Sequence, residues 1–213
     1  MKKTLVLAGA LSAVVMSTAL TANADTQKTY DFSDFDELDI AAGVEVVYTA
    51  GSDYSVVADF RKGGPDDMKI REDGGRLYIS KKAKSGWGDT LRVTVKITAP
   101  DLNAVEASSG SSIRASGIKS DAFALKVSSG ASAELSGTCG TMTVRASSGG
   151  SADAKDVKCK SVTANASSGG SAQAYASDSA TSKTSSGGSV DIWGKPSDRT
   201  ANKSVSGGST SFH

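Results

Sequence analysis

Two cysteines are the most reactive side chains in this sequence, and their spacing predicts a disulfide. Cys139 and Cys159 are the only cysteines, and they lie 20 residues apart. Each precedes a Ser-Ser-Gly tripeptide by eight residues. If those tripeptides mark successive turns of a repeat, the cysteines stack about 4.8 Å apart, which is within the usual Cα separation of a disulfide. The alternative is a pair of free thiols buried as small apolar side chains.

Two tryptophans are candidate ligand-binding residues. Trp87 lies in a glycine-containing segment, residues 85–89, and Trp193 lies next to a turn. An indole offers a large apolar area and a polar edge, which suits contact with a sugar ring or a partner protein. The structural alternative is a ring that folds over an end of the domain.

Hydrolysis of a polysaccharide would require paired carboxylates, and the sequence offers only scattered ones. Glycosidases hold two carboxyl groups roughly 5–10 Å apart. Glu134, Asp153 and Asp191 are expected to face outward, but they form no obvious cluster on matching positions of the repeat. We therefore predict no catalytic residue and no cofactor, and we keep a polysaccharide-active enzyme as the alternative.

No metal site is predicted. The only histidine is His213, at the end of the sequence. Calcium-binding solenoids carry an Asp in each Gly-rich turn, and the Ser-Gly turns of this chain lack it. The acidic pairs at residues 66–67 and 72–73 could each hold one ion, although a solvated acidic turn is the expected interpretation.

A recurring Ser-Ser-Gly motif predicts the elements that position these residues. Successive copies begin 18 to 20 residues apart. The five full copies begin at Ser108, Ser128, Ser147, Ser167 and Ser185 and end at Gly110, Gly130, Gly149, Gly169 and Gly187, and a sixth copy, in which Val205 replaces the first Ser, ends at Gly207. A fixed period near this length is typical of a solenoid in which each repeat buries its apolar face against the next. We interpret the serines and glycines as a ladder of structural corners, because glycine accompanies serine in every copy. The alternative is a row of hydroxyls that binds glycans or ordered water.

Alternating hydrophobicity on both sides of the motif predicts two strands in each repeat. Phe123, Leu125 and Val127 precede one copy, with Lys126 between them, and Ala133 and Leu135 follow it. This period of two indicates strands with one buried face. A rung is therefore expected to be a strand, a Ser-Gly corner, a second strand and a looser return, and the fold class is an all-β parallel β-helix with about 20 residues per rung.

The N-terminal part is less regular. Residues 41–43, Ala-Ala-Gly, resemble a degenerate corner between two short apolar strands. The tract from 43 to 108 can be interpreted as wider rungs that merge with the repeat or as an antiparallel cap over the end of the solenoid. We favour wider or less regular rungs, and we divide the domain into an irregular part, 25–100, and regular Ser-Gly rungs, 101–213.

The beginning of the chain and its composition predict an exported protein. Residues 1–24 combine Lys2 and Lys3, a short apolar stretch and an Ala-Asn-Ala cleavage site, which is typical of a signal peptide. A single domain, 25–213, follows without a further apolar run of membrane length. Lys and Arg number 24 and Asp and Glu 23, so the charge balance does not favour nucleic acid as a partner.

The order of several sequence blocks resembles the head GIN domain family of putative autotransporter adhesins. The likeness lies in residues 35–51, with Gly43-Val44-Glu45 at the place of the family's Gly-Ile-Asn, in residues 73–79 and 93–102, and in the Ser-Gly rungs. This resemblance implies a β-helical domain of the kind found on exported or lipid-anchored envelope proteins. It implies no catalytic residues.

These observations predict an exported, non-catalytic binding module of the cell envelope. We expect it in the periplasm, at the outer membrane or outside the cell. Its candidate partners are an envelope or extracellular polysaccharide and a surface protein. A self-associating structural protein is a further alternative, because the open ends of a solenoid expose unpaired strand edges through which copies could pair.

Overall fold

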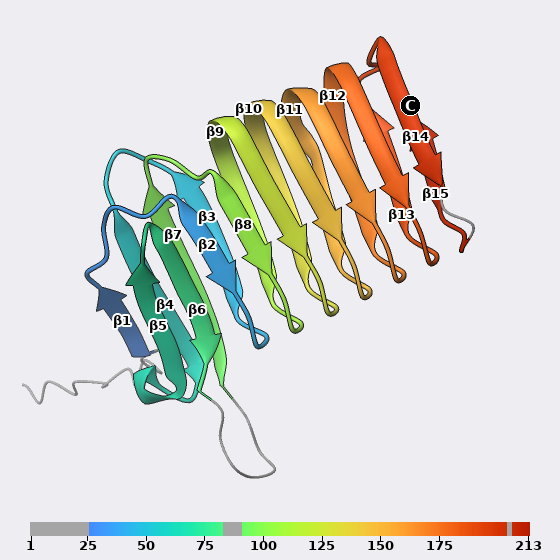
Figure 1. The fold of residues 1–213 in the computed structure, drawn as a ribbon. Helices are drawn as coiled ribbons and strands as arrows, with labels where there is room; N and C mark the ends of the chain where they lie inside the picture. Colours follow the sequence, from blue (N-terminus) through green and yellow to red (C-terminus); the bar gives the residue numbers. More distant parts are fainter. Residues whose placement is uncertain (1–25, 83–90, 204–205) are drawn as a thin grey trace, which may run out of the picture.

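The computed structural model describes residues 26–82, 91–203 and 206–213, and most of them lie in one continuous 15-stranded sheet (Figure 1). The strands are β1 (Thr26–Tyr30), β2 (Glu37–Ile40), β3 (Glu45–Ala50), β4 (Ser55–Lys62), β5 (Met68–Asp73), β6 (Arg76–Lys81), β7 (Arg92–Ala99), β8 (Ala104–Ala107), β9 (Ser112–Val127), β10 (Ser132–Ala146), β11 (Ser151–Ala166), β12 (Ser171–Thr184), β13 (Ser189–Trp193), β14 (Asp198–Lys203) and β15 (Ser209–Phe212). A 3-10 turn, η1 (Pro65–Asp67), lies between β4 and β5. The predicted parallel β-solenoid is confirmed, and the expected signal segment, 1–24, lies outside the described residues.

The solenoid has two faces that meet at the Ser-Gly turns. The pre-turn face contains the strands that lead into the turns and those stacked on them: β6, β2, β8, the second halves of β9 to β12, and β14. The post-turn face contains β7, β3, the first halves of β9 to β12, β13 and β15. Neighbouring strands within each face are parallel and in register, so that Val144 of β10 lies opposite Ala164 of β11.

The Ser-Gly corners are tight turns in which both central residues have positive φ. In the turn at 128–131, φ is 52° at Ser129 and 70° at Gly130, and the amide of Ala131 donates to the carbonyl of Ser128 over 3.1 Å. This is the pattern of a type I′ turn, which usually closes a hairpin of two paired strands. Here the two flanking strands lie on opposite faces and pair instead with the rungs before and after them.

The turns form one column along the solenoid. The amides of the glycines in the first four Ser-Ser-Gly turns donate to the carbonyl of the second serine in the next turn, as from Gly130 to Ser148 over 3.1 Å and from Gly149 to Ser168 over 3.2 Å. The column begins at the degenerate corner, where φ is 59° at Ala42 and 67° at Gly43, and Gly43 donates to Ser109. That corner is therefore a rung turn, as its sequence predicts.

Along two inward columns the side chains become smaller toward the C-terminal end. The buried position after each turn is occupied along the stack by Val44, Ser111, Ala131, Gly150, Gly170 and Gly188. A second inward column, three residues before each turn, runs through Leu38, Val105, Leu125, Val144, Ala164 and Ser182. Because interiors are close-packed, smaller residues bring the two faces closer together. A Cβ atom at Gly170 would lie 2.4 Å from the carbonyl oxygen of Ala146.

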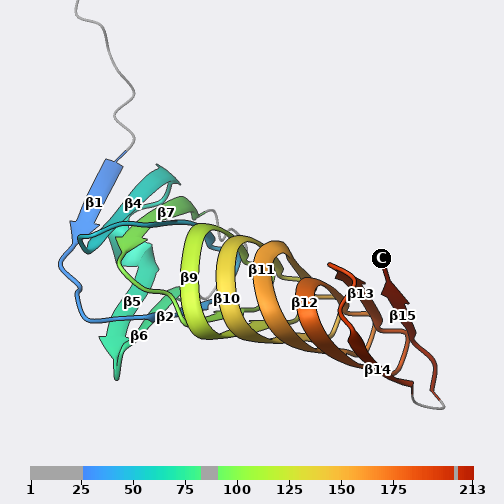
Figure 2. The same ribbon diagram turned by 90° about the horizontal axis from the view of Figure 1, so that it is seen from above.

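The looser return expected after each second strand is observed between β13 and β14, at residues 194–197, but not in β9 to β12. β9, β10, β11 and β12 are 16, 15, 16 and 14 residues long, and each continues around the wide bend opposite the turns (Figure 2). The bend stays in the sheet because the rungs on either side supply backbone partners through it. Register shifts, such as that between Leu135 and Gly137, absorb differences in rung length.

The N-terminal part combines the two arrangements that the sequence left open. β2 and β3 form one rung, and β6 and β7 stack on it in parallel. β4 then pairs antiparallel with β7, β1 with β4, and β5 with β6. Irregular rungs therefore merge with the repeat, and antiparallel strands cover the end of the stack.

The opposite end of the solenoid is polar. All six residues of β14 are exposed. Arg199 and Lys203 occupy positions in register with the buried Ala180 and Thr184 of β12, and the Arg199 guanidinium lies 5.6 Å from the centre of the Phe212 ring. Charged side chains at the last inward positions disfavour the stacking of another rung.

Cys139 and Cys159 occupy equivalent positions in β10 and β11. Their Cα atoms are 4.5 Å apart, and their Sγ atoms form a disulfide. Both side chains are buried beside the wide bend. The disulfide therefore joins two consecutive rungs at the side opposite the turn column.

Two neighbouring glycines are expected to respond differently to substitution. Gly169→Ala adds a methyl group in open space, so its cost is only the positive φ of 70°, about 1–2 kcal/mol. Gly170→Ala forces the methyl group against the backbone of the preceding rung and is expected to cost about 3 kcal/mol or more. Urea unfolding of the oxidised proteins measures both values. Equal losses in the two variants would contradict the close approach at Gly170.

Removal of the disulfide is expected to lower the free energy of unfolding by about 3 kcal/mol, because the bond closes a loop across a separation of 20 residues. The test is urea unfolding of the Cys139→Ala/Cys159→Ala double variant, with dithiothreitol-treated wild-type protein as the control. Alkylation of the denatured, unreduced protein by iodoacetamide would show free thiols and contradict the prediction.

Candidate binding surface

Outward side chains form columns, because the rungs stack in register. The first outward position of the post-turn face carries a serine in six consecutive rungs: Ser112, Ser132, Ser151, Ser171, Ser189 and Ser209. This column lies directly after the turns. It was not predicted from the sequence, where only the serines within the Ser-Ser-Gly motif were considered. Of the turn serines themselves, the first is partly buried and the second is exposed at the tip of the turn.

The next outward column of this face is acidic, and it corrects one expectation. The register runs from Arg114 through Glu134, Asp153 and Gln173 to Asp191, so the three carboxylates do share matching rung positions. Each of the three carboxylates follows the first Ser of its motif by six residues, so the sequence already places them at one position of the repeat. Each carboxylate also has a basic neighbour.

Arg114 and Lys155 compensate Glu134 and Asp153, and the Asp191 carboxylate contacts the His213 ring. Glu134 Oε2 lies 3.3 Å from Arg114 Nε, Asp153 pairs with Lys155, and Asp191 Oδ1 lies 3.2 Å from His213 Nε2. Acceptors that are already engaged with basic groups are poorly placed for acid–base chemistry. The column therefore serves mainly to set the charge of this face.

An aromatic patch lies beside the acidic column, where the post-turn face meets the wide bend. Lys158, Tyr175 and Trp193 are in register on three consecutive strands. The Lys158 Nζ atom lies 4.2 Å from the centre of the Tyr175 ring. The His213 ring stacks on Trp193, with centroids 4.6 Å apart and an angle of 21° between the planes.

The aromatic patch surrounds a shallow hollow of about 410 Å³. Its lining consists of Lys155, Asp156, Lys158, Tyr175, Trp193, Gly194, Lys195 and His213. Trp193 and Tyr175 are partly buried, so that their rings are held in place while part of each remains accessible. An aromatic surface with donors around it can stack on a sugar ring and bond its hydroxyls.

The other sequence candidates are placed as follows. Trp87 lies outside the described residues. Asp67 Oδ2 accepts a hydrogen bond from the Gly64 amide over 3.1 Å, and Glu72 Oε1 accepts one from the Gly75 amide over 2.8 Å. These carboxylates thus stabilise turns, and within the described ranges no group of three or more His, Cys, Asp or Glu residues is arranged to hold a metal ion.

A carboxylate pair that the sequence did not reveal lies on the pre-turn face. Asp39 of β2 is in register with Glu106 of β8, although the two residues are far apart in the sequence. Glu106 Oε1 is 2.5 Å from Lys126 Nζ. Burial, with a smaller contribution from the Glu106 charge, raises the pKa of Asp39 above its ordinary value. The pair lies on a strand face rather than on a loop, so nothing local in the sequence marks it.

Comparison with known families gives one match over most of the chain. Residues 34–196 match the family described as putative auto-transporter adhesin, head GIN domain. No curated protein matches the sequence significantly.

Solved structures with the same fold are also found. A putative adhesin from Bacteroides fragilis is similar with a TM-score of 0.69 and 17% identity, over 88% of this chain and 95% of that one. A putative adhesin from Parabacteroides merdae gives a TM-score of 0.50 and 14% identity over 88% and 95%. At these identities the likeness shows the fold alone. In the described part of the chain, no helix is long and apolar enough to cross a bilayer.

The raised pKa of Asp39 predicts a pH-dependent effect of Asp39→Asn. The folded protein holds this proton more tightly than the unfolded chain, so Asp39 disfavours folding once the pH exceeds its folded pKa. Asp39→Asn is therefore expected to raise the midpoint of urea unfolding at pH 7. At about pH 3 the Asp39 carboxyl is neutral, like the amide that replaces it, and the midpoint is expected to be unchanged. A lower midpoint at pH 7 would contradict the assignment.

Proposed function

Because the chain belongs to the putative auto-transporter adhesin, head GIN domain family, we propose that it is an exported, non-catalytic binding module of the cell envelope. In this role the solenoid displays a rigid surface to a polysaccharide or to a surface protein. The observation that carries the proposal is the aromatic patch, since it combines ring surface, hydrogen-bond donors and a hollow on neighbouring rungs.

The rigidity of the aromatic patch supports a binding role. Tyr175 and Trp193 lie on strands β12 and β13, which pair with each other in register. The amide of His213 donates to the carbonyl of Ile192 over 2.8 Å, which fixes the residue that stacks on Trp193. Side chains that are already ordered lose little conformational entropy when a ligand binds, so more of the contact energy appears as affinity.

Two further features support an extracytoplasmic setting. The sequence begins with a segment that has the composition of a signal peptide. The disulfide between Cys139 and Cys159 suits an oxidising compartment such as the periplasm or the cell exterior. The family name agrees with this setting, because adhesins act at the cell surface.

A polysaccharide-active enzyme is the second candidate function. Asp39, with its raised pKa, and Glu106 lie on adjacent strands and would be the acidic pair of such an enzyme. Glu106 is, however, engaged with Lys126, and the pair lies on a face of the sheet next to further charged groups. The compensated carboxylates of the post-turn face offer no better pair, and we therefore favour binding.

Trp193→Ala is expected to weaken carbohydrate binding by about tenfold, because it removes the largest ring of the aromatic patch. The measurement is a titration of the purified protein with soluble neutral glycans, namely laminarin, dextran and chitin hexasaccharide. Neutral probes are used so that charge cannot account for the binding.

Tyr78→Ala is the matched control, because Tyr78 is a partly buried aromatic residue on the opposite face. This variant is expected to bind like the wild type. The proposed site is wrong if the two variants lose equal affinity or if Trp193→Ala binds as well as the wild type. Release of reducing sugars from the same glycans would favour the enzyme instead.

A further inference from the structure

A strip of cations and amides runs along the pre-turn face at the outward position two or three residues before each turn. Arg145, Asn165, Lys183 and Asn202 are in register on β10, β11, β12 and β14, and we call them the cationic strip. Arg145, Lys183 and Asn202 are exposed, and Asn165 is partly buried. The strip crosses four rungs, so its long axis follows the solenoid rather than a single strand.

The two cations of the strip are uncompensated. The preceding member of the same column, Lys126, is paired with Glu106. Arg145 and Lys183, by contrast, form no salt bridge with any residue that the structure describes. Since the two lie two rungs apart, their attachment points are separated by about 10 Å.

Hydroxyl groups flank the cationic strip on both sides. The next outward column toward the wide bend consists of Thr143, Thr163, Thr181 and Thr200. On the turn side lie the first serines of three successive turns, Ser147, Ser167 and Ser185. The face therefore offers many short hydrogen-bonding groups around two isolated charges.

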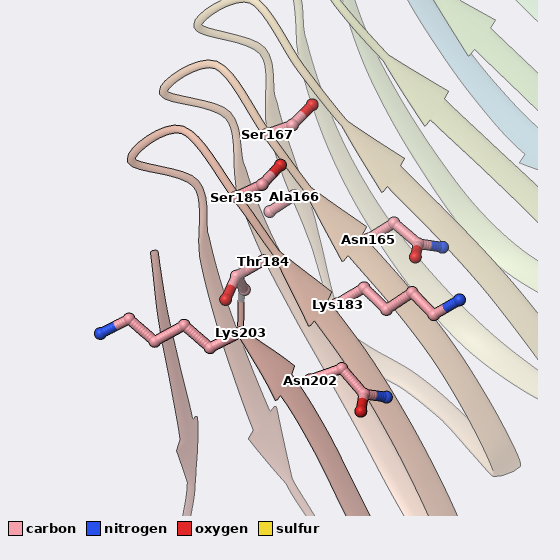
Figure 3. Close-up of a pocket in the computed structure, with 8 residues that line it drawn as sticks. All are labelled: Asn165, Ala166, Ser167, Lys183, Thr184, Ser185, Asn202 and Lys203. Carbon is pink, nitrogen blue, oxygen red and sulfur yellow. The ribbon is translucent and has the colours of Figure 1, made fainter. Parts of the chain in front are cut away.

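A hollow of about 400 Å³ lies over the C-terminal part of the strip (Figure 3). Its lining consists of Asn165, Ala166, Ser167, Lys183, Thr184, Ser185, Asn202 and Lys203. In Figure 3 the side chains of Asn165, Lys183 and Asn202 extend to the same side of the ribbon, and Lys203 extends the other way. The lining contains no carboxylate, so the site favours an anion.

We propose that the cationic strip binds a linear acidic polysaccharide that runs along the solenoid axis. Carboxylates on alternate sugar units lie against Arg145 and Lys183, and the guanidinium can bond a carboxylate through two parallel N–H groups. Asn165 hydrogen-bonds a hydroxyl of the intervening sugar, and Asn202 bonds one of the sugar beyond Lys183. This inference rests on the proposed binding function and adds to it a second surface and a ligand class.

The composition of the strip favours an acidic glycan over nucleic acid. DNA presents closely spaced phosphates and is bound through many cations, whereas this strip has two cations separated by an amide. Binding of single strands also relies on aromatic side chains on which bases stack, and the strip has none. Amide and hydroxyl columns suit a ligand that carries many hydroxyls beside its negative charges.

The opposite, post-turn face is less favourable for an acidic polymer. The equivalent outward column there contains Glu134, Asp153 and Asp191. On that face Arg114 and Lys155 are engaged with Glu134 and Asp153, whereas Arg145 and Lys183 have no carboxylate partner among the described residues, so charge complementarity favours the pre-turn face for an acidic polymer. The aromatic patch lies on the other side of the molecule and remains accessible to its own ligand.

Calorimetric titration with polygalacturonate tests the proposal, with its methyl ester as the uncharged form of the same polymer. The wild type is expected to bind polygalacturonate, to bind it less tightly as salt is added, and to bind the ester at least about tenfold more weakly. Arg145→Gln and Lys183→Gln are each expected to weaken binding of polygalacturonate by about tenfold.

Arg114→Gln is the matched control, because it removes the same charge from the acidic column of the opposite face. It is expected to change affinity by less than about twofold. Equal losses in Arg114→Gln and Arg145→Gln, equal binding of the ester, tighter binding of single-stranded DNA, or no binding of polygalacturonate would each overturn the proposal.

Trp193→Ala separates this proposal from the proposed function of the aromatic patch. The variant is expected to bind polygalacturonate as the wild type does, even where it has lost affinity for neutral glycans. Loss of polygalacturonate binding in Trp193→Ala would place the acidic polymer at the aromatic patch and overturn the role of the cationic strip. If the neutral glycans do not bind but polygalacturonate does, the result contradicts the proposed role of the aromatic patch and leaves that of the cationic strip intact.

Discussion

The backbone hydrogen bonds that link one Ser-Gly turn to the next hold every rung in register. Each turn reverses the chain within two residues of positive φ, and the glycine amide donates to the following turn. A slip of one residue would turn each strand's inward side chains outward, so the turn column fixes both the core and the surface. The disulfide acts at the opposite side of the rung, where register shifts make the alignment less regular. Turn and disulfide therefore constrain the two ends of a rung by different means.

Narrowing of the solenoid follows from the same stacking. On the pre-turn face the inward column passes from Leu38 near the N-terminal cap to Ala164 and Ser182, and glycine after the turn lets the two faces approach. Less apolar area is then buried per rung, and hydrogen bonding along the axis carries more of the stability. The cap at one end and the charged β14 at the other protect edges that a repeat fold would otherwise leave open. The chain is thus built as a finite stack.

In-register stacking also converts a short repeat into long surface columns. One face carries serines and compensated carboxylates beside an aromatic patch, and the other carries threonines, amides and two uncompensated cations. The family to which the chain belongs and this division of charge both agree with an adhesin-like module. Columns of side chains that are held on rigid strands and extend over several rungs suit an extended ligand better than a small one. Binding, rather than catalysis, is what such a surface favours.

The sequence alone determined the repeat, the inward-facing residues of the strands and the corners, because a period of two and a recurring Ser-Gly are local signals. It also predicted the proximity of Cys139 and Cys159 from one repeat length. Tertiary structure decided the continuous bends, the antiparallel strands of the cap, and the neighbours of each outward residue. Counting from the Ser-Gly motif aligns the strands on both sides of a turn but not the residues of the bend, where register shifts absorb the differences in rung length. Only the stacked rungs show that Asp39 lies beside Glu106 and which charged side chains of the outward columns have a salt-bridge partner.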